Sequence, residues 1–554
     1  MALENAHVCV LGSSALASES LKNLALPGIG SFTVVDDALV GEHDTQTNFF
    51  VQADDGGKPR AQCIVDELSE LNPDVRGTAV IKAPAALLAS DCPADTALVS
   101  EASLVIACGL DEAVVRDLAL QCWEYSTPLI VATAAGFMAC IRTVVPEHAV
   151  VESHAELKQD LRLTAPFPAL LAFADAIDLS ALDSTDLAHV PFVVILIKAL
   201  QKWAAANDLK LGGDGEVAVA FKRLAEVRDI VRKMAPSSDE ENFVEATKAI
   251  NANCVAYEMP AEVAQILGDP AAAEPSAGSS DAIDLHKSAA AASSSADADA
   301  AAPSPDKFWL LARALRRYTE SEYAQGKLPL SGAIPDMKAD TKSYIALQRV
   351  YKQKADEDKA ELTRHVHAVL RDSGLAEDLI CQSEIDVYCK NARRLRLLRF
   401  TPLHTEIKCG PANAGEIAFS EALPLYALFR GCGAFYAKHA RYPGALSSSS
   451  SASTSPTVAE LDDLVEADGR ELGEITNGLL SSWGVSSADQ PVVVSEALAA
   501  EFARSGHDEL HNTASMSGGV IAQEAIKLLT HQYVPANNLC IIDGAQAKIH
   551  VTMV

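Results

Sequence analysis

The chain has 554 residues, which at ~150 residues per domain is enough for several domains and for a core that needs no disulfide or metal staples. Lys plus Arg number 45 and Asp plus Glu number 75, which gives a formal net charge of −30. So acidic a surface excludes a broad footprint on nucleic-acid phosphates and suits basic protein partners or simple solubility.

Strand and helix signals alternate over residues 1–150. The predicted elements are the strand His7–Leu11, the helix Ala15–Leu26, the strand Phe32–Asp36, the helix Arg60–Leu71, the strand Leu104–Cys108, the helix Glu112–Tyr125 and the strands Leu129–Thr133 and Met138–Val145. Parallel neighbouring strands need crossover helices, so this order predicts an α/β domain whose mainly parallel sheet is covered on both faces.

Helical periodicity dominates residues 151–505. The predicted helices are Phe192–Ala206, Phe221–Met234, Glu241–Ala252, Phe308–Tyr318, Tyr344–Arg371 and Ala422–His439. Two low-complexity segments, 268–306 and 447–455, are rich in Ala and Ser and contain almost no large apolar side chain. Such segments cannot bury enough surface to offset their ordering entropy, so we expect both to be mobile loops.

The α/β pattern returns over residues 506–554. We predict a helix that opens at Ser517-Gly518-Gly519 and runs through Val520–Thr530, followed by strands over Asn538–Asp543 and Ala547–Met553. The simplest topology is one α/β domain, split by a long, mainly helical insertion over 151–505.

The turn after the first predicted strand is where a nucleotide-binding sheet receives phosphates at a helix start. Here it reads Gly12-Ser13-Ser14-Ala15-Leu16-Ala17, so the first glycine is present and side chains replace the others. Asp36 ends the second strand, where an acid that binds ribose would be expected. These residues either form a nucleotide site or belong to a nucleotide fold that has lost its ligand, and the side chains in the turn favour the second interpretation.

The remaining chemistry-bearing residues form no recognisable site. The twelve cysteines show no C-x-x-C pair and no Cys/His spacing typical of zinc, so we predict no metal site. Cys9, Cys108 and Cys540 lie in apolar runs and are interpreted as small buried hydrophobic residues. The chain shows no secretory signal and no apolar run long enough to span a membrane, so we expect a soluble protein of the cytoplasm or nucleus.

Several blocks in a fixed order give the sequence a family resemblance. They are Leu21–Phe32, Val34–Asp36, Asn48–Phe50, Gly57–Ala61, Val151–His154, Asp160–Leu163, Pro166–Pro168, Asp239–Phe243, Phe308–Leu315, Ile334–Met337, Arg441–Gly444 and Gly518–Lys527. In these blocks the chain resembles the adenylation enzymes that activate ubiquitin-like modifiers, with a ThiF/MoeB-type Rossmann-like domain. The resemblance is strongest to the regulatory subunits of the heterodimeric enzymes that activate the Nedd (Rub) modifier.

The resemblance implies a division of labour between two related chains. The catalytic subunit would hold Mg-ATP and the thioester cysteine. This chain would supply the other half of the paired adenylation fold, with no cofactor and no catalytic residue of its own. Ser14, Ala15 and Ala17 replace glycines of the catalytic relatives, Ala38 replaces a second acid, and Arg60 replaces a lysine that meets phosphate. The assembled pair would adenylate the modifier's C-terminal glycine, form the thioester and pass the modifier transiently to a conjugating enzyme, which leads to cullin neddylation.

The resemblance also implies a surface that faces the catalytic subunit. It comprises His189, Asp336, Met337, Asp340, Tyr344 and Gln348. The family begins with a lead-in segment that carries an arginine directed at the partner's ATP, whereas this chain starts almost on the first strand, so we assign no such arginine.

Four other functions stay open at this point. One is the regulatory subunit of the SUMO-activating enzyme, which lacks so long an insertion, and another is a homodimeric adenylating enzyme, which needs an intact glycine turn. A nicotinamide-dependent oxidoreductase and a scaffold pseudoenzyme outside the activating enzyme complete the alternatives.

Overall fold

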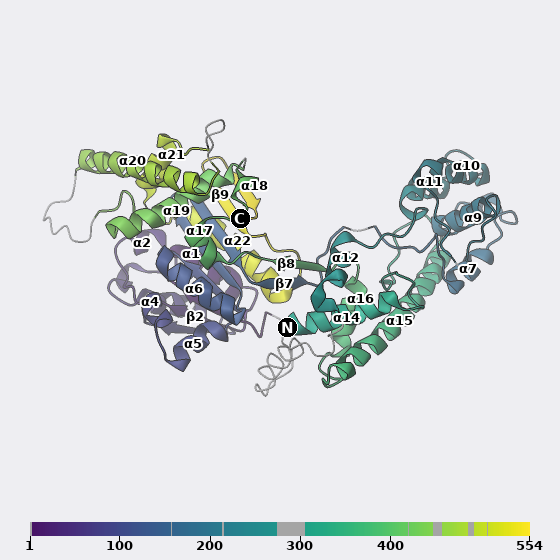
Figure 1. Cartoon of the computed structure of the whole chain (residues 1–554), viewed down its shortest axis with the longest axis horizontal. Helices are drawn as coiled ribbons and strands as arrows, with labels where there is room; N and C mark the ends of the chain where they lie inside the picture. Colours follow the sequence, from purple (N-terminus) through teal and green to yellow (C-terminus); the bar gives the residue numbers. More distant parts are fainter. Residues whose placement is uncertain are drawn as a thin grey trace. The chain divides into compact units, whose positions relative to one another are not determined.

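The computed structural model describes residues 3–156, 158–212, 215–273, 305–418, 420–446, 457–485, 492–506 and 508–554, with the side chains of 305 and 306 left aside. These residues form two compact units, coloured by sequence in Figure 1. One unit joins Met1–His148 to Leu398–Val554, and the other is built from the intervening residues.

The first unit is centred on an eight-stranded sheet with the order β10-β9-β6-β5-β4-β1-β2-β3. Its strands are β1 (His7–Leu11), β2 (Ser31–Val35), β3 (Arg76–Val80), β4 (Leu104–Cys108), β5 (Leu129–Ala135), β6 (Met138–Val144), β9 (Leu539–Asp543) and β10 (Lys548–Thr552). The ladders from β3 to β5 are parallel, whereas β6, β9 and β10 are each antiparallel to their neighbours. The predicted mainly parallel α/β sheet is therefore confirmed.

Both faces of the central strands are buried, because alternate residues of one strand point to opposite faces. Val8 and Val10 of β1 belong to one apolar cluster and Cys9 and Leu11 to another. Helices α1 (Ala15–Ala25), α3 (Arg60–Leu71) and α22 (His511–Thr530) contribute to the first cluster, and α5 (Pro93–Ser100) and α6 (Glu112–Tyr125) contribute to the second.

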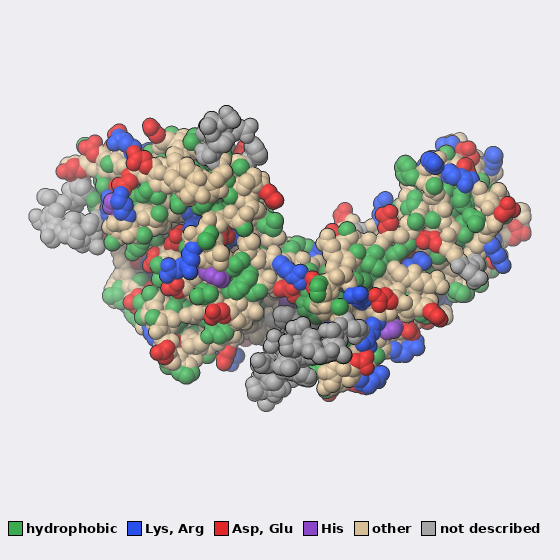
Figure 2. Space-filling model, viewed as in Figure 1, with side chains coloured by type: hydrophobic (Ala, Val, Ile, Leu, Met, Phe, Trp, Pro, Cys, Tyr) green, Lys and Arg blue, Asp and Glu red, His purple; other side chains and the backbone are tan. Residues whose placement is uncertain are grey.

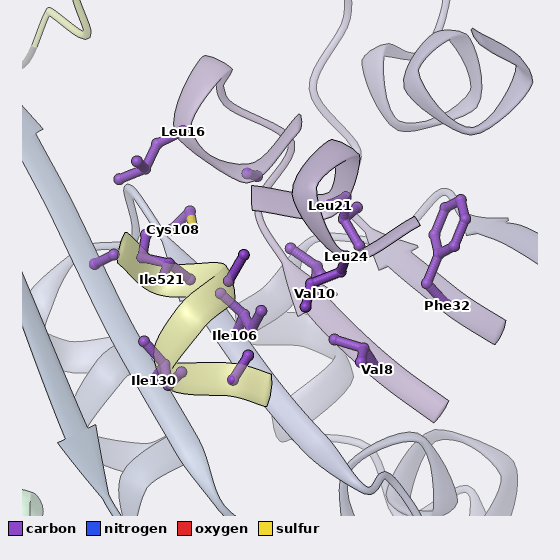
Figure 3. Packing of buried hydrophobic residues seen from close by; sticks show 14 of the residues in the cluster. Val8, Val10, Leu16, Leu21, Leu24, Phe32, Ile106, Cys108, Ile130 and Ile521 are labelled. Carbon is purple, nitrogen blue, oxygen red and sulfur yellow. The ribbon is translucent and has the colours of Figure 1, made fainter. Parts of the chain in front are cut away.

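Helices α1 and α22 pack closely, although almost five hundred residues separate them in the sequence. A Cβ on Gly518 would lie 2.8 Å from the Glu19 main-chain carbon, so only glycine permits this approach. Figure 3 shows Leu21 and Leu24 of α1 beside Val10 of β1, while Ile521 of α22 lies near Ile106. The C-terminal segment thereby completes the core that the N-terminal segment begins.

Further helices of this unit pack on the β6 and β9 side, where Ala427 and Leu428 share a cluster with Met138 and Ile541. The helices of the first unit not yet given are α2 (Asp44–Thr47), α4 (Pro84–Leu88), α17 (Leu403–Cys409), α18 (Ala414–Ile417), α19 (Ala422–His439), α20 (Val458–Ser482) and α21 (Glu496–Ser505), with a 3-10 turn η1 (Ala53–Asp55). The helical stretch that we expected as one insertion over 151–505 thus divides near residue 398, and its later part packs with the sheet.

The second unit is helical and has two apolar clusters. Its elements are α7 (Pro168–Asp175), α8 (Ser184–Leu187), α9 (Phe192–Ala205), α10 (Leu224–Met234), α11 (Glu241–Asn253), α12 (Ala261–Gly268), α14 (Pro305–Glu320), α15 (Thr341–Asp372) and α16 (Gln382–Asn391), with 3-10 turns η2 (Phe221–Arg223) and η3 (Pro270–Ala272). β7 (Glu147–Val150) and β8 (Arg396–Arg399) form a separate two-stranded sheet.

Some expectations differ from the structure in detail. Helix α22 begins at His511 rather than at Ser517, and the edge strand β3 was not predicted. Of the low-complexity segments, 274–304 and 447–455 lie outside the described residues, while 268–273 close α12 and form η3.

Candidate functional site

The turn that follows β1 is shaped by Gly12. Gly12 has a φ of +90°, and a Cβ there would collide with the carbonyl oxygen of Cys108 on the neighbouring strand. Its N–H donates to the carbonyl of Val35 at 3.0 Å. The backbone geometry of this turn therefore requires glycine at position 12, whether or not a ligand binds.

Asp36 occupies the position predicted for a ribose-binding acid, but its carboxylate is engaged with the protein. Oδ2 accepts from Ser13 N–H at 2.9 Å, from Ser13 Oγ at 2.5 Å and from Arg60 Nη2 at 3.2 Å, and Oδ1 accepts from Ala38 N–H at 3.0 Å. With 7% of its surface exposed, Asp36 is buried. Both carboxylate oxygens therefore accept hydrogen bonds from residues in and around the turn.

Arg60, at the start of α3, joins Asp36 to a second acid. Its Nη1 donates to Asp44 Oδ1 at 2.6 Å, and its Nε donates to Ser13 Oγ at 2.9 Å. Burial lowers the pKa of Arg60, but the carboxylates of Asp44 and Asp36 outweigh burial and the net direction is upward. The guanidinium is thus held by two internal carboxylates.

Glu509, which sequence reasoning missed, occupies the start of α1. Its Oε2 accepts from Leu16 N–H at 2.7 Å, although the two residues are 493 positions apart. No side chain of the N-cap residue, Ser14, caps this helix. The Glu509 carboxylate therefore takes an N–H at the helix end where a phosphate would bind.

Burial raises the pKa of Glu509, an effect that the bond from Leu16 N–H opposes. The backbone near Glu509 is also fixed, because Gly136 N–H donates to the carbonyl of Asp508 at 2.9 Å. No short-range signal could have revealed this residue, since its partner lies at the other end of the sequence.

The turn combines three acidic side chains with one basic one. Asp36, Asp44 and Glu509 surround it, and Arg60 is their shared cation. A nucleotide would bring several more negative charges close to this excess of acidic side chains. Coulomb repulsion, which is stronger in a buried site than in water, opposes that approach. The side chains of Ala15 and Ala17, which stand where the catalytic relatives have glycine, are buried in the core.

The predicted partner-facing residues lie in the second unit, and the structure brings several of them together. Asp340 N–H donates to the His189 carbonyl at 3.4 Å. Asp340 also caps α15, where its Oδ1 accepts from Ser343 N–H at 2.9 Å, and these bonds to Ser343 lower its pKa. Tyr344 follows in the first turn of α15, with its N–H donating to the Asp340 carbonyl at 2.9 Å.

The other members of that set differ in exposure. Asp336 and Gln348 are exposed, whereas Met337 is buried at 9% and belongs to the core of the unit. Met337 therefore supports the fold around the surface rather than forming its outer face.

The three cysteines that the sequence places in apolar strands lie in the core. Cys9, Cys108 and Cys540 are buried as predicted, and burial raises the pKa of Cys9 to about 12, which keeps the thiol protonated. No group of three His, Cys, Asp or Glu side chains among the described residues could hold a metal ion. Within the same residues, no helix is long and apolar enough to cross a bilayer.

Comparison with known proteins relates the whole chain to one group. Residues 1–553 match the ThiF family. The chain is 34% identical over 543 residues to the NEDD8-activating enzyme E1 regulatory subunit of Danio rerio, an alignment that covers 97% of this chain and 92% of that protein. It is 31% identical to the regulatory subunit AXL of Arabidopsis thaliana (99% and 95% covered) and 31% identical to the regulatory subunit of Drosophila melanogaster (98% and 92%).

Proposed function

The chain belongs to the ThiF family and, within it, to the NEDD8-activating enzyme E1 regulatory subunits, and we propose that it acts as the half of that enzyme that binds no nucleotide. Paired with a catalytic subunit, it supports adenylation of the modifier's C-terminal glycine and formation of the thioester on the partner's cysteine. Adenylation depends largely on positioning and charge stabilisation, which an extensive interface between two related domains can preorganise.

One observation carries the proposal, namely the closed state of the turn after β1. The N–H groups of Ser13 and Leu16 are taken by the carboxylates of Asp36 and Glu509. A phosphate would have to displace these carboxylates and would meet their charge. These occupied N–H groups support the proposal that Mg-ATP binds in the catalytic subunit.

The surface around His189 and the start of α15 is the proposed contact with the catalytic subunit. Asp340 links His189 to α15, and Asp336 and Gln348 are exposed beside it. We expect the double variant Asp336→Arg with Gln348→Arg, which reverses one charge and adds another, to weaken the association measured by calorimetry at least tenfold. Asp229→Arg, an exposed charge reversal on α10 of the same unit, is the control for the Asp336 change and should leave association unchanged.

The assembled enzyme would receive the Nedd/Rub modifier and hand it to a conjugating enzyme in the cytoplasm or nucleus. The activity test is modifier-dependent ATP–pyrophosphate exchange by this chain alone, by the catalytic subunit alone and by the mixture. We expect exchange in the mixture and none from this chain alone. Strong exchange by this chain alone would refute the proposal, and failure of the two chains to associate would favour a scaffold role instead.

A further inference from the structure

The second unit contains a polar cavity of about 230 Å³ that the proposed function does not use. Four cations line it, Lys158, Arg162, Lys327 and Arg393, with only Asp160 and Glu258 as lining acids. The lining thus carries an excess of two positive charges in a chain with a net charge of −30. Elsewhere, on the face shown in Figure 2, acidic and basic side chains are interspersed.

The two guanidinium groups are held in fixed positions. The Cζ atoms of Arg162 and Arg393 lie 5.6 Å and 5.5 Å from the centroid of the Tyr257 ring, which places both within cation–π range. The Tyr257 hydroxyl accepts from Leu328 N–H at 3.1 Å, so the ring itself is anchored. Burial raises the pKa of Tyr257, which therefore adds no negative charge.

One internal carboxylate serves both arginines. Asp160 Oδ2 accepts from Arg162 Nε at 2.8 Å and from Arg393 Nη1 at 3.5 Å, and Asp160 Oδ1 accepts from Arg162 N–H at 3.1 Å. Arg393 Nε is buried without a partner among the described residues. Arg162 also keeps a φ of +53°, a strained conformation for a non-glycine residue. Asp160 thus holds both arginines, and the Nε donor of Arg393 is still unused among the described residues.

The two lysines are free to bind a ligand. In the described part of the chain, neither Lys158 nor Lys327 has an ion-pair partner. Glu258 and Lys158 are both exposed, so solvent screens both of these opposite charges. Glu216, which does not line the cavity, is also exposed and accepts from Tyr257 N–H at 3.0 Å and from the hydroxyl of Thr164. The less exposed lining charges, three cations against Asp160, keep an excess of two positive charges.

We propose that this cavity binds a dianionic phosphoryl group, with Lys158 and Lys327 as point charges and Arg393 as an oriented donor. Two excess positive charges match a phosphoryl dianion better than a single carboxylate, and fixed guanidinium groups suit phosphate oxygens. The volume fits a phosphoryl group with a small carrier, whereas a nucleotide needs a larger and more apolar cleft. The site lies within the second unit and is independent of the nucleotide turn.

Calorimetry on the full chain at constant ionic strength tests the site, with inorganic phosphate, O-phosphoserine and serine as probes. We expect both phosphoryl compounds to bind and serine not to bind. Tighter binding of O-phosphoserine than of phosphate would identify a phosphorylated side chain as the source, and equal or weaker binding would identify free phosphate.

Two matched double variants distinguish binding in this cavity from nonspecific attraction of anions to the surface. Lys158→Gln with Lys327→Gln removes two lysines that form no ion pair with any described residue, so the fold should be kept and affinity should fall at least tenfold. Lys222→Gln with Lys233→Gln removes the same charge from exposed positions of the same unit and should bind as the wild type does. Absence of phosphate binding up to about 20 mM, or equal affinity in the two double variants, would overturn the proposal.

Discussion

Glu509 should stabilise the first unit by capping α1, and its removal gives the most informative perturbation. Glu509→Ala leaves Leu16 N–H buried without its acceptor, which costs about 1–3 kcal/mol for an unsatisfied buried donor. The carboxylate also loses its favourable position at the positive end of the helix, worth about 0.5 kcal/mol. Because ionising a buried carboxyl is itself costly, we expect a net loss of about 2 kcal/mol in the free energy of unfolding.

The pH dependence adds a second readout. Burial raises the pKa of Glu509 in the folded state above its unfolded value, so its contribution is fully present below the unfolded pKa and is lost as pH rises through the folded pKa. Glu509→Gln keeps an acceptor without titrating. The stability of wild type relative to Glu509→Gln should therefore decrease as pH rises from about 4.5 toward neutrality.

Urea unfolding followed by circular dichroism measures both effects. Glu501→Ala is the control, because it removes a partly exposed carboxylate that pairs weakly with Arg504 on α21, and it should change stability by less than about 0.5 kcal/mol. If Glu509→Ala unfolded at the same urea concentration as the control, the capping contact would contribute nothing and Glu509 would not stabilise α1.

Three further substitutions test a turn, a buried ion pair and a helix cap. Gly12→Ala should lower the free energy of unfolding by about 2 kcal/mol or more, because φ is +90° and the new Cβ meets a backbone carbonyl. If the variant melted at the wild-type temperature, the turn would be able to relax around the new side chain. Arg142→Ala should cost about 3–5 kcal/mol, because it strands the buried carboxylate of Glu406, and unfolding within 1 kcal/mol of wild type would contradict that ion pair. Asp340→Ala should lower the free energy of unfolding by about 1 kcal/mol, because α15 loses its N-cap. Asp340→Asn should retain most of that stability in the same melting assay, because its side-chain oxygen can still accept from Ser343 N–H.

The sequence predicted the central strands well because they are buried on both faces and read as apolar runs, as in His7–Leu11 and Leu104–Cys108. It missed β3 because that edge strand is half-exposed and contains Arg76 and Gly77. It also placed the start of α22 too late, since His511 and the polar residues after it show no apolar period. Packing against α1 extends that helix beyond what its own sequence signals.

The site was predictable only in part. The broken glycine turn and Asp36 can be found by position, because both follow short strands in the first forty residues. The contact of Glu509 with Leu16 joins the two ends of the chain and depends on the whole fold. For the same reason, periodicity alone did not indicate that α19–α21 pack with the sheet rather than with the earlier helices.

Nucleotide stoichiometry tests the central claim most directly. Mg-ATP should be titrated by calorimetry into this chain alone, into the catalytic subunit alone and into the purified pair. We expect no binding to this chain and one nucleotide per pair. Two nucleotides per pair, or tight binding by this chain alone, would contradict the closed turn formed by Asp36, Arg60 and Glu509.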